Sequence, residues 1–173
     1  TSTCYITADP SSSHGVTINE SRDIVIQTAV ACTQNNCLIS VTTSKNITLD
    51  SVTMQGSEIY IQGSSVILEG TSKIDTSYNG YTDASGTGGG TSASATGRGG
   101  GGGGHCGEGG DAGYPTGSGG SVYGDLESPI LYGSGGGTGR GYSSNTKEGG
   151  HGGGKVHVVA DTVLHIASGV SIQ

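Results

Sequence analysis

Few residues in this chain have types and spacing that could do chemistry, and metal binding is the first chemistry to consider. The metal-ligand types in or near glycine-rich sequence are His105, Cys106, Glu108, Asp111 and His151. Zinc sites use short Cys-x-x-Cys or His-x-x-x-His spacings, and the sequence contains neither. The Gly-Glu-Gly-Gly-Asp run also lacks the repeated nonapeptide of a calcium-binding roll. We therefore expect no metal and no cofactor.

Hydrolysis of a polysaccharide would need two or three carboxylates on neighbouring strands. The acids in strand-like segments are Asp50, Glu58, Glu69 and Asp75. Glu58 and Glu69 have the positions of solvated outer-face residues, whereas Asp50 and Asp75 fall at turns. A serine nucleophile is not indicated either, because no Gly-x-Ser-x-Gly elbow joins a strand to a helix. We expect no catalytic residue and predict that the protein is not an enzyme.

Two asparagines lie in acceptor sequences for N-linked glycans. These sequences are Asn19-Glu20-Ser21 and Asn46-Ile47-Thr48, and a weaker one with cysteine in third place is Asn35-Asn36-Cys37. We expect N-linked glycans on Asn46, at a predicted corner of the fold, and on Asn19.

The chain has four cysteines, which allow three disulfide connectivities. Cys32 and Cys37 flank a turn-like tetrad, so we favour a small disulfide loop there and a second bond between Cys4 and Cys106. Disulfides accompany thin cores in oxidising compartments. The cysteines therefore favour a secreted or cell-surface protein.

The elements that must position these residues are short strands. Of the 173 residues, 31% are hydrophobic and none is Trp or Phe, so the core must be thin and aliphatic. Apolar and polar residues alternate in β-branched segments at 24–26, 38–41, 47–49, 52–54, 59–61 and 66–68 and around Ile74. Two-residue hairpin signals are missing between them. The pattern predicts an all-β fold with essentially no α-helix, in which short strands form the faces of a β-solenoid.

An internal repeat supports this interpretation. Segment 59–70 returns as 156–168, with apolar positions recurring at an offset of 97. With one residue inserted, Leu68 matches Ile166 and Ile74 matches Ile172. Each copy reads as one rung, meaning one turn of a solenoid, and a rung buries its aliphatic side chains only against its neighbours. The second copy stops at Gln173 within its last strand, so we expect the sequence to be a piece of a longer polypeptide.

Residues 80–154 hold 31 of the 36 glycines. A flexible linker would explain glycine and serine alone, but bulky residues such as Tyr123, Leu126 and Tyr132 lie in the middle of the tract. We predict a compact loop whose extended glycine segments pack backbone to backbone, with Tyr and Leu side chains covering the solenoid. The predicted fold is a parallel β-helix with rungs at 1–79, a packed glycine-rich insertion at 80–154 and a returning rung at 155–173.

The segment Tyr-Gly-Asp-Leu-Glu-Ser-Pro-Ile-Leu-Tyr-Gly-Ser-Gly-Gly-Gly at 123–137, with the glycine tracts around it, resembles the glycine-rich β-helix repeat modules of very large secreted or surface proteins in protists, algae and some bacteria. The resemblance spans about residues 58–173. It implies a repeat module of an extracellular fibre, coat or adhesin, and no known chemistry.

Charge and composition exclude several partners. The formal net charge is −7 with seven scattered basic residues, which argues against nucleic acid. No run approaches the roughly 20 apolar residues of a membrane helix, so we expect no membrane insertion.

The leading hypothesis is a non-enzymatic structural subunit of a secreted fibre, surface filament or coat, held by self-association or by neighbouring repeats of its own polypeptide. A second hypothesis is an adhesin whose loop binds glycans through Tyr123 and Tyr132. A third is ice binding, because a flat row of threonines on a solenoid face or bundled glycine helices can order water, although Thr42, Thr48 and Thr53 form no repeated Thr-x-Thr row.

Overall fold

The computed structural model describes residues 2–6, 15–32, 36–113, 117–125, 130–142 and 145–173. Within these residues the chain forms thirteen strands and no helix, which confirms the all-β prediction. Accordingly, the described part of the chain contains no helix that could cross a membrane. Two compact units are present, Thr1–Thr76 with Val156–Gln173, and Ser77–Lys155.

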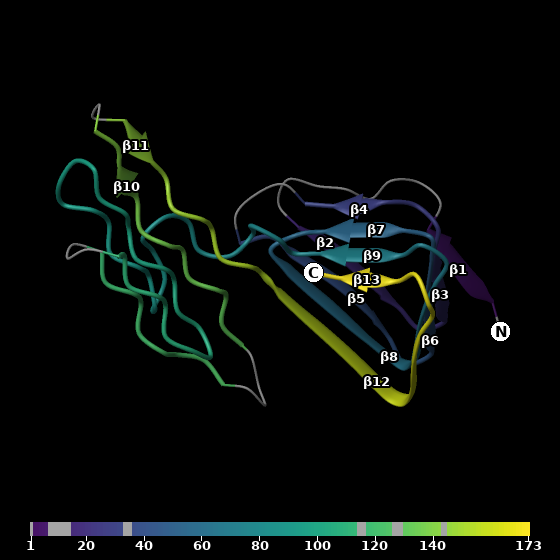
Figure 1. The fold of residues 1–173 in the computed structure, drawn as a ribbon. Helices are drawn as coiled ribbons and strands as arrows, with labels where there is room; N and C mark the ends of the chain where they lie inside the picture. The colour runs from purple at the N-terminus through teal and green to yellow at the C-terminus, as the bar shows by residue number, and fades with distance from the viewer. Residues whose placement is uncertain (1, 7–14, 33–35, 114–116, 126–129, 143–144) are drawn as a thin grey trace. The chain divides into compact units, whose positions relative to one another are not determined.

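The first unit contains two sheets that enclose an aliphatic core (Figure 1). The seven-stranded sheet has the order β1-β3-β6-β8-β5-β2, with β12 paired to β8, and the four-stranded sheet has the order β13-β9-β7-β4. The strands of the larger sheet are β1 (Thr3–Ile6), β2 (Val16–Glu20), β3 (Asp23–Ile26), β5 (Leu38–Thr43), β6 (Asn46–Asp50), β8 (Glu58–Glu69) and β12 (Lys155–Ile166). Those of the smaller sheet are β4 (Val30–Ala31), β7 (Thr53–Gln55), β9 (Lys73–Asp75) and β13 (Ser171–Ile172).

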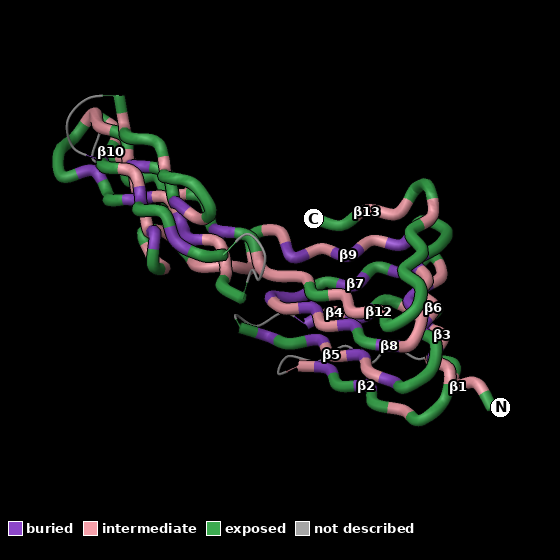
Figure 2. Tube along the Cα trace, turned by 90° about the horizontal axis from the view of Figure 1, so that it is seen from below, coloured by how far each residue is buried: buried purple, intermediate pink, exposed green. Residues whose placement is uncertain are grey.

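Parallel pairing stacks apolar residues into columns. In the smaller sheet Val30 pairs with Met54, Met54 with Ile74, and Ile74 with Ile172. The first three of these side chains are fully buried, and the alternation of buried and less buried residues along the strands is visible in Figure 2. Because paired residues of parallel strands point to the same side, each circuit of the chain extends the columns of the one before. The pairing of Ile74 with Ile172 confirms the register that the internal repeat predicts.

One predicted corner is not a break in the structure. The sequence predicts separate strands on either side of Gly63-Ser64-Ser65, but β8 runs continuously through this segment. Ser64 N–H donates to the carbonyl oxygen of Lys45 at 2.7 Å, and Gly63 lies so close to Ile47 and Lys45 that a Cβ would be 3.0 Å from the Lys45 carbonyl oxygen. The backbone therefore stays paired through the bend. The seven-stranded sheet thus curves around the core without dividing into separate faces.

One of the two favoured disulfides is present. Cys32 and Cys37 are joined, and both are buried in the core. Cys4 and Cys106 carry free thiols, so the second favoured bond is not formed in this structure. Cys4 pairs in register with the fully buried Ile24, so its side chain points to the core side of β1 as part of an apolar column.

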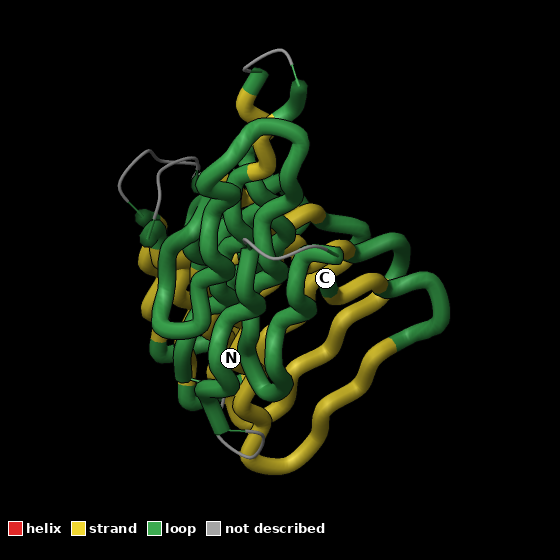
Figure 3. The backbone as a smooth tube through the Cα atoms, turned by 60° about the vertical axis from the view of Figure 1, so that its left-hand side comes forward, coloured by secondary structure: helices red, strands yellow, loops and turns green. Residues whose placement is uncertain are grey.

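The second unit is held by backbone hydrogen bonds between segments that are mostly not strands (Figure 3). Its two short strands are β10 (Gly139–Arg140) and β11 (Thr146–Lys147). Gly101 N–H donates to the Thr91 oxygen at 3.0 Å, and Gly104 N–H donates to the Gly88 oxygen at 2.8 Å. The donors in these two bonds are three residues apart. The same spacing recurs where Gly133 N–H donates to the Gly153 oxygen and Gly136 N–H donates to the Gly150 oxygen. A bond every third residue is the repeat of a polyproline II helix, so glycine segments pack backbone to backbone as expected.

Segment 99–104 lies at the centre of this glycine bundle, the name used below for the packed segments of Ser77–Lys155. Gly101 accepts a hydrogen bond from Gly137 N–H, and Gly102 bonds to Gly110 and Gly120. The segments approach more closely than side chains would allow. A Cβ on Gly120 would overlap the carbonyl oxygen of Gly88, whereas a Cβ on Gly110 would meet nothing within 4 Å.

We expect Gly120→Ala to destabilise the bundle and Gly110→Ala to leave it intact. The Gly120 variant must separate its segment from Gly88, which breaks the bonds from Gly109 and to Gly102 and costs more than about 2 kcal/mol. The Gly110 variant should be unchanged or up to about 1 kcal/mol more stable. Thermal unfolding and hydrogen exchange of the amides in 99–104 measure this, and equal protection in the two variants would contradict the arrangement.

Candidate functional site

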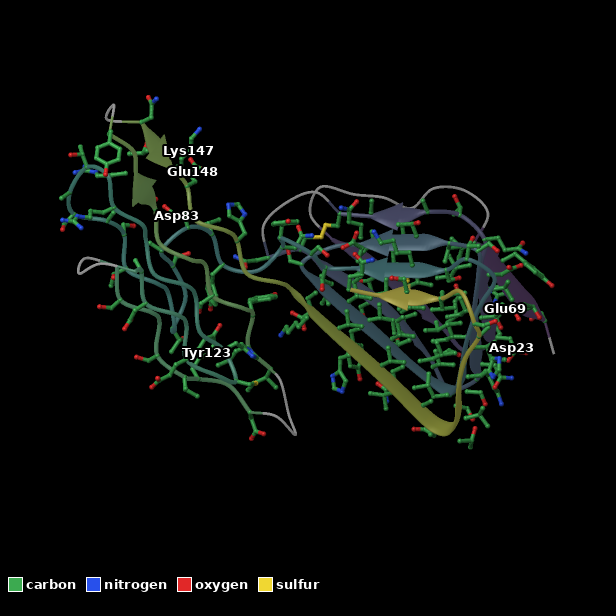
Figure 4. All side chains as sticks on the ribbon, viewed as in Figure 1. Asp23, Glu69, Asp83, Tyr123, Lys147 and Glu148 are labelled. Carbon is green, nitrogen blue, oxygen red and sulfur yellow. A yellow bond between two sulfur atoms is a disulfide. The ribbon has the colours of Figure 1, made fainter. Side chains whose placement is uncertain are left out.

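Tyr123 is an internal support and does not present a binding surface. Its side chain is only 9% exposed, and its hydroxyl donates to the carbonyl oxygen of Tyr132 (Figure 4). The Ser134 hydroxyl donates to the Tyr123 oxygen at 2.8 Å, and Gly88 N–H donates to the Ser134 oxygen at 3.0 Å. This chain of bonds ties three segments of the bundle together. The sequence hypothesis that Tyr123 contacts a glycan directly is therefore not supported by its position.

Two ring pairs and one cation lie around the hydrogen bond between Tyr123 and Tyr132, and we name His105, Tyr123, Tyr81, Tyr132 and Lys155 together the aromatic cluster. The His105 ring packs edge-on against Tyr123 at 4.9 Å, and Tyr81 packs edge-on against Tyr132 at 6.0 Å between centroids. The Lys155 ammonium lies 5.1 Å from the centroid of Tyr132. Tyr132 is half-buried, and one of its faces is therefore occupied within the bundle.

Exposed aliphatic residues flank this cluster in the sequence. Val122 is 55% exposed, Ile130 69% and Leu131 38%. We name these three residues the apolar rim. Their neighbours Tyr123 and Tyr132 are fixed by the bonds described above, so the backbone that carries the rim is held in place.

The residues considered as metal ligands do not gather at one place. His105 Nδ1 lies 3.1 Å from Cys106 Sγ, and His105 Nε2 lies 3.4 Å from the Leu131 carbonyl oxygen. Asp111 instead accepts a hydrogen bond from Gly119 N–H at 2.7 Å. Among the residues that the structure describes, no three His, Cys, Asp or Glu side chains gather as a metal site would require.

Of the four acids considered for hydrolysis, only Asp50 and Glu69 are register partners on adjacent strands. Asp75 forms an ion pair with Lys73 at 2.7 Å, and Glu58 pairs in register with Leu38. The sequence pattern does not reveal the juxtaposition of Asp50 and Glu69. Asp50 accepts a hydrogen bond from the neighbouring Ser51 hydroxyl, and Glu69 is exposed at the end of its strand (Figure 4).

Both predicted glycan acceptors are accessible. Asn19 is exposed on β2, and Asn46 is exposed at the first position of β6. Asn46 N–H donates to Asp23 Oδ1 at 3.1 Å, which fixes the backbone there. Of the weaker sequon, Asn36 is exposed and Asn35 lies outside the described residues. Attachment of glycans stays a prediction.

The threonines considered for ice binding do not stack. Thr42, Thr48 and Thr53 lie on β5, β6 and β7 respectively. The register partners of Thr42 are Asn19 and Gln62, so its column contains no second threonine among these strands.

The last circuit of the first unit carries uncovered apolar residues. Ala167 N–H donates to the Leu68 carbonyl oxygen at 2.9 Å, the relation that parallel pairing gives when Leu68 lies beside Ile166. Leu164, two positions earlier, then lies beside Val66. Val66 and Leu68 are fully buried, whereas Leu164 is 49% and Ile166 48% exposed.

Ile172 is likewise more exposed than its partner in the preceding circuit. Its side chain is 45% exposed, whereas Ile74 beside it is fully buried. Figure 2 shows β12 and β13 without the buried positions that mark β8 and β9. We name the inward residues Leu164, Ile166 and Ile172 the open apolar edge. Sequence reasoning identified this circuit through the internal repeat but could not show that its inward side chains lack cover.

Comparison with family models, characterised proteins and solved structures gives no match to this chain.

We expect Tyr123→Phe to lower the free energy of unfolding by about 1–3 kcal/mol, because the half-buried Tyr132 carbonyl and the buried Ser134 hydroxyl lose a partner. Tyr142→Phe is the matched control, since Tyr142 is 92% exposed, and it should change stability by less than about 0.5 kcal/mol. Denaturant unfolding monitored by near-ultraviolet circular dichroism measures both. Equal stability of the two variants would mean that the hydroxyl network does not hold the bundle.

Proposed function

We propose that this protein is a non-enzymatic structural module of an extracellular fibre, surface filament or coat. In this proposal the first unit is a parallel β-solenoid, and further layers stack on it through the open apolar edge. The partners are neighbouring repeats of the same polypeptide or other copies of it. The open apolar edge is the observation that carries the proposal.

The energetics of stacking favour growth at this edge. In the circuit before the last, the inward residues Val66, Leu68 and Ile74 are fully buried, whereas in the last one Leu164, Ile166 and Ile172 remain about half exposed. Covering half of an aliphatic side chain contributes about 1 kcal/mol. The outer side of β12 is paired with no other strand among the described residues, so its free N–H and C=O groups also invite a further strand. The exposed aliphatic side chains and the unpaired backbone groups could therefore both be covered by a further strand that pairs in parallel with β12.

Two features agree with an extracellular location. The buried Cys32–Cys37 disulfide is typical of oxidising compartments, and in a thin core it adds a constraint that aliphatic packing does not supply. Asn19 and Asn46 lie in exposed acceptor sequences, as a secreted glycoprotein requires. We propose that the protein is secreted or displayed at the cell surface and carries N-linked glycans at these two positions.

We expect the purified chain to associate, and the double variant Leu164→Lys/Ile166→Lys to be monomeric, because charges on the inward side of an edge strand block stacking. Val163→Lys/His165→Lys is the matched control, since these residues alternate with the first pair on the same strand and point outward. Sedimentation velocity and negative-stain electron microscopy measure the assembly state. A wild-type chain that stays monomeric at every concentration tested would overturn the proposal.

A second candidate function is a surface adhesin that binds glycans. The apolar rim favours it, because Val122, Ile130 and Leu131 are exposed on a backbone held by the aromatic cluster. Apolar surfaces of this kind bind the hydrocarbon faces of sugars or partner proteins.

For this candidate we expect binding on a glycan array to be lost in Ile130→Ser/Leu131→Ser, because the exposed contact surface is removed. It should be retained in Val163→Ser, which removes an exposed aliphatic side chain from the other unit. An array without any wild-type signal would eliminate the adhesin candidate and leave the structural proposal untouched.

A further inference from the structure

A polar pocket lies at the bend where β2 is followed by β3 and β5 by β6. It has a volume of about 300 Å³ and is lined by Ser2, Ser21, Arg22, Asp23 and Lys45. This size is at the lower end of the range of ligand pockets, which runs from about 300 to 1,000 Å³. The lining comes from three passes of the chain, and every side chain in it is polar.

The register of the sheet relates the two cations of this pocket. Glu20 pairs with Thr43 before the bend and Ile24 pairs with Ile47 after it, both at a separation of 23 residues. Arg22 and Lys45 occupy equivalent places in two bends, Arg22 between β2 and β3 and Lys45 between β5 and β6, and both line the pocket. Glu20 contacts Arg22 Nε at 3.1 Å and offsets part of its charge. An anion between the two cations would be attracted by both.

The backbone beneath these two side chains is fixed by a buried hydroxyl. Thr43 is 8% exposed, and its Oγ1 donates to the Arg22 carbonyl oxygen at 2.8 Å and accepts from Lys45 N–H at 3.0 Å. Ser64 N–H donates to the Lys45 carbonyl oxygen from the following circuit at 2.7 Å. The two turns thus keep their positions without a ligand, which lowers the entropic cost of binding one.

The charged ends of both side chains remain available. The Lys45 ammonium contacts no hydrogen-bonding group among the residues that the structure describes. Arg22 uses its Nε for Glu20 Oε2 at 3.1 Å, and its side chain is 46% exposed. Asp23, labelled in Figure 4, accepts from Asn46 N–H through Oδ1, and as a lining residue it adds a carboxylate to the pocket.

We infer that this pocket binds one acidic sugar unit of a polysaccharide, with its carboxylate or sulfate group between Arg22 and Lys45. The planar Arg22 guanidinium suits two oxygens of such a group, and Lys45 adds a point charge. Asp23 and the serine hydroxyls accept from and donate to the hydroxyls of the same sugar.

Diffuse attraction of polyanions does not explain such binding, because the formal net charge of the chain is −7. The interaction is therefore local to the bend. It goes beyond the structural proposal, since a module with this pocket is attached to an acidic polysaccharide matrix whether or not its edge stacks.

The test compares three probes, namely a galacturonic acid tetrasaccharide, a sulfated galactan tetrasaccharide and the neutral galactan tetrasaccharide, by isothermal titration calorimetry at low salt. We expect one of the two acidic probes to bind and the neutral one not to bind. The tighter acidic probe identifies carboxylate or sulfate as the recognised group. Raising the salt concentration should weaken the binding, because the cations are partly exposed.

The variant Arg22→Gln/Lys45→Gln should weaken binding of the acidic probe at least about tenfold, since two charge-assisted contacts are lost. Arg140→Gln/Lys147→Gln, which makes the same change in charge on exposed residues of β10 and β11, should alter the affinity less than about twofold. Thermal unfolding of both variants reports that they are folded. Equal loss in the two variants, or no binding of either acidic probe to the wild type, would overturn the inference.

Discussion

Both units of this protein depend on one constraint. The backbone N–H and C=O groups of each segment must form their hydrogen bonds with another segment of the chain. Within the described residues there is no helix, so hardly any segment can satisfy its own N–H and C=O groups internally. The first unit meets the requirement with strands that pair in parallel. The second meets it with glycine segments that bond at every third residue. Stability in both depends on contacts between distant parts of the sequence.

The two solutions use side chains in opposite ways. In the first unit inward Ile, Val and Leu side chains fill the space between the sheets, and the columns of Ile24, Ile47 and Val66 exclude water from the ladder. In the glycine bundle any Cβ at a contact such as Gly120 with Gly88 would hold the backbones apart, so the side chain must be absent. Burial of Tyr123 then supplies what the glycines cannot, because its ring and hydroxyl fix segments that have no side chains of their own.

A feature of this fold can be predicted from the sequence when the pattern that indicates it lies within one segment, and not when it depends on pairing between distant segments of unlike sequence. Alternation within a segment is local, so the strands around Ile47, Ile59 and Ile74 are predictable. The partner of Ile74 is predictable because the two copies of the repeated segment preserve a recognisable pattern. Register between unlike circuits has no such signal, so the equivalent places of Arg22 and Lys45 and the position of Asp50 beside Glu69 emerge only from the structure. The burial of Tyr123 was equally hidden, since glycine sequences give no periodicity of hydrophobicity.

The composition of the last circuit bears on whether its edge is protected against pairing. Proteins protect a free edge with inward-pointing charges, proline or a very short strand. The strand β12 has twelve residues and no proline, and Val156, Val158, Ala160, Leu164 and Ile166 are apolar, with the polar Thr162 between them. Its charged and titratable residues are Lys155, His157, Asp161 and His165, of which the last three are exposed. Edge protection of this kind is what separates a strand that resists pairing from one that can pair, so the side chains of β12 are the part of the first unit on which the proposed stacking depends.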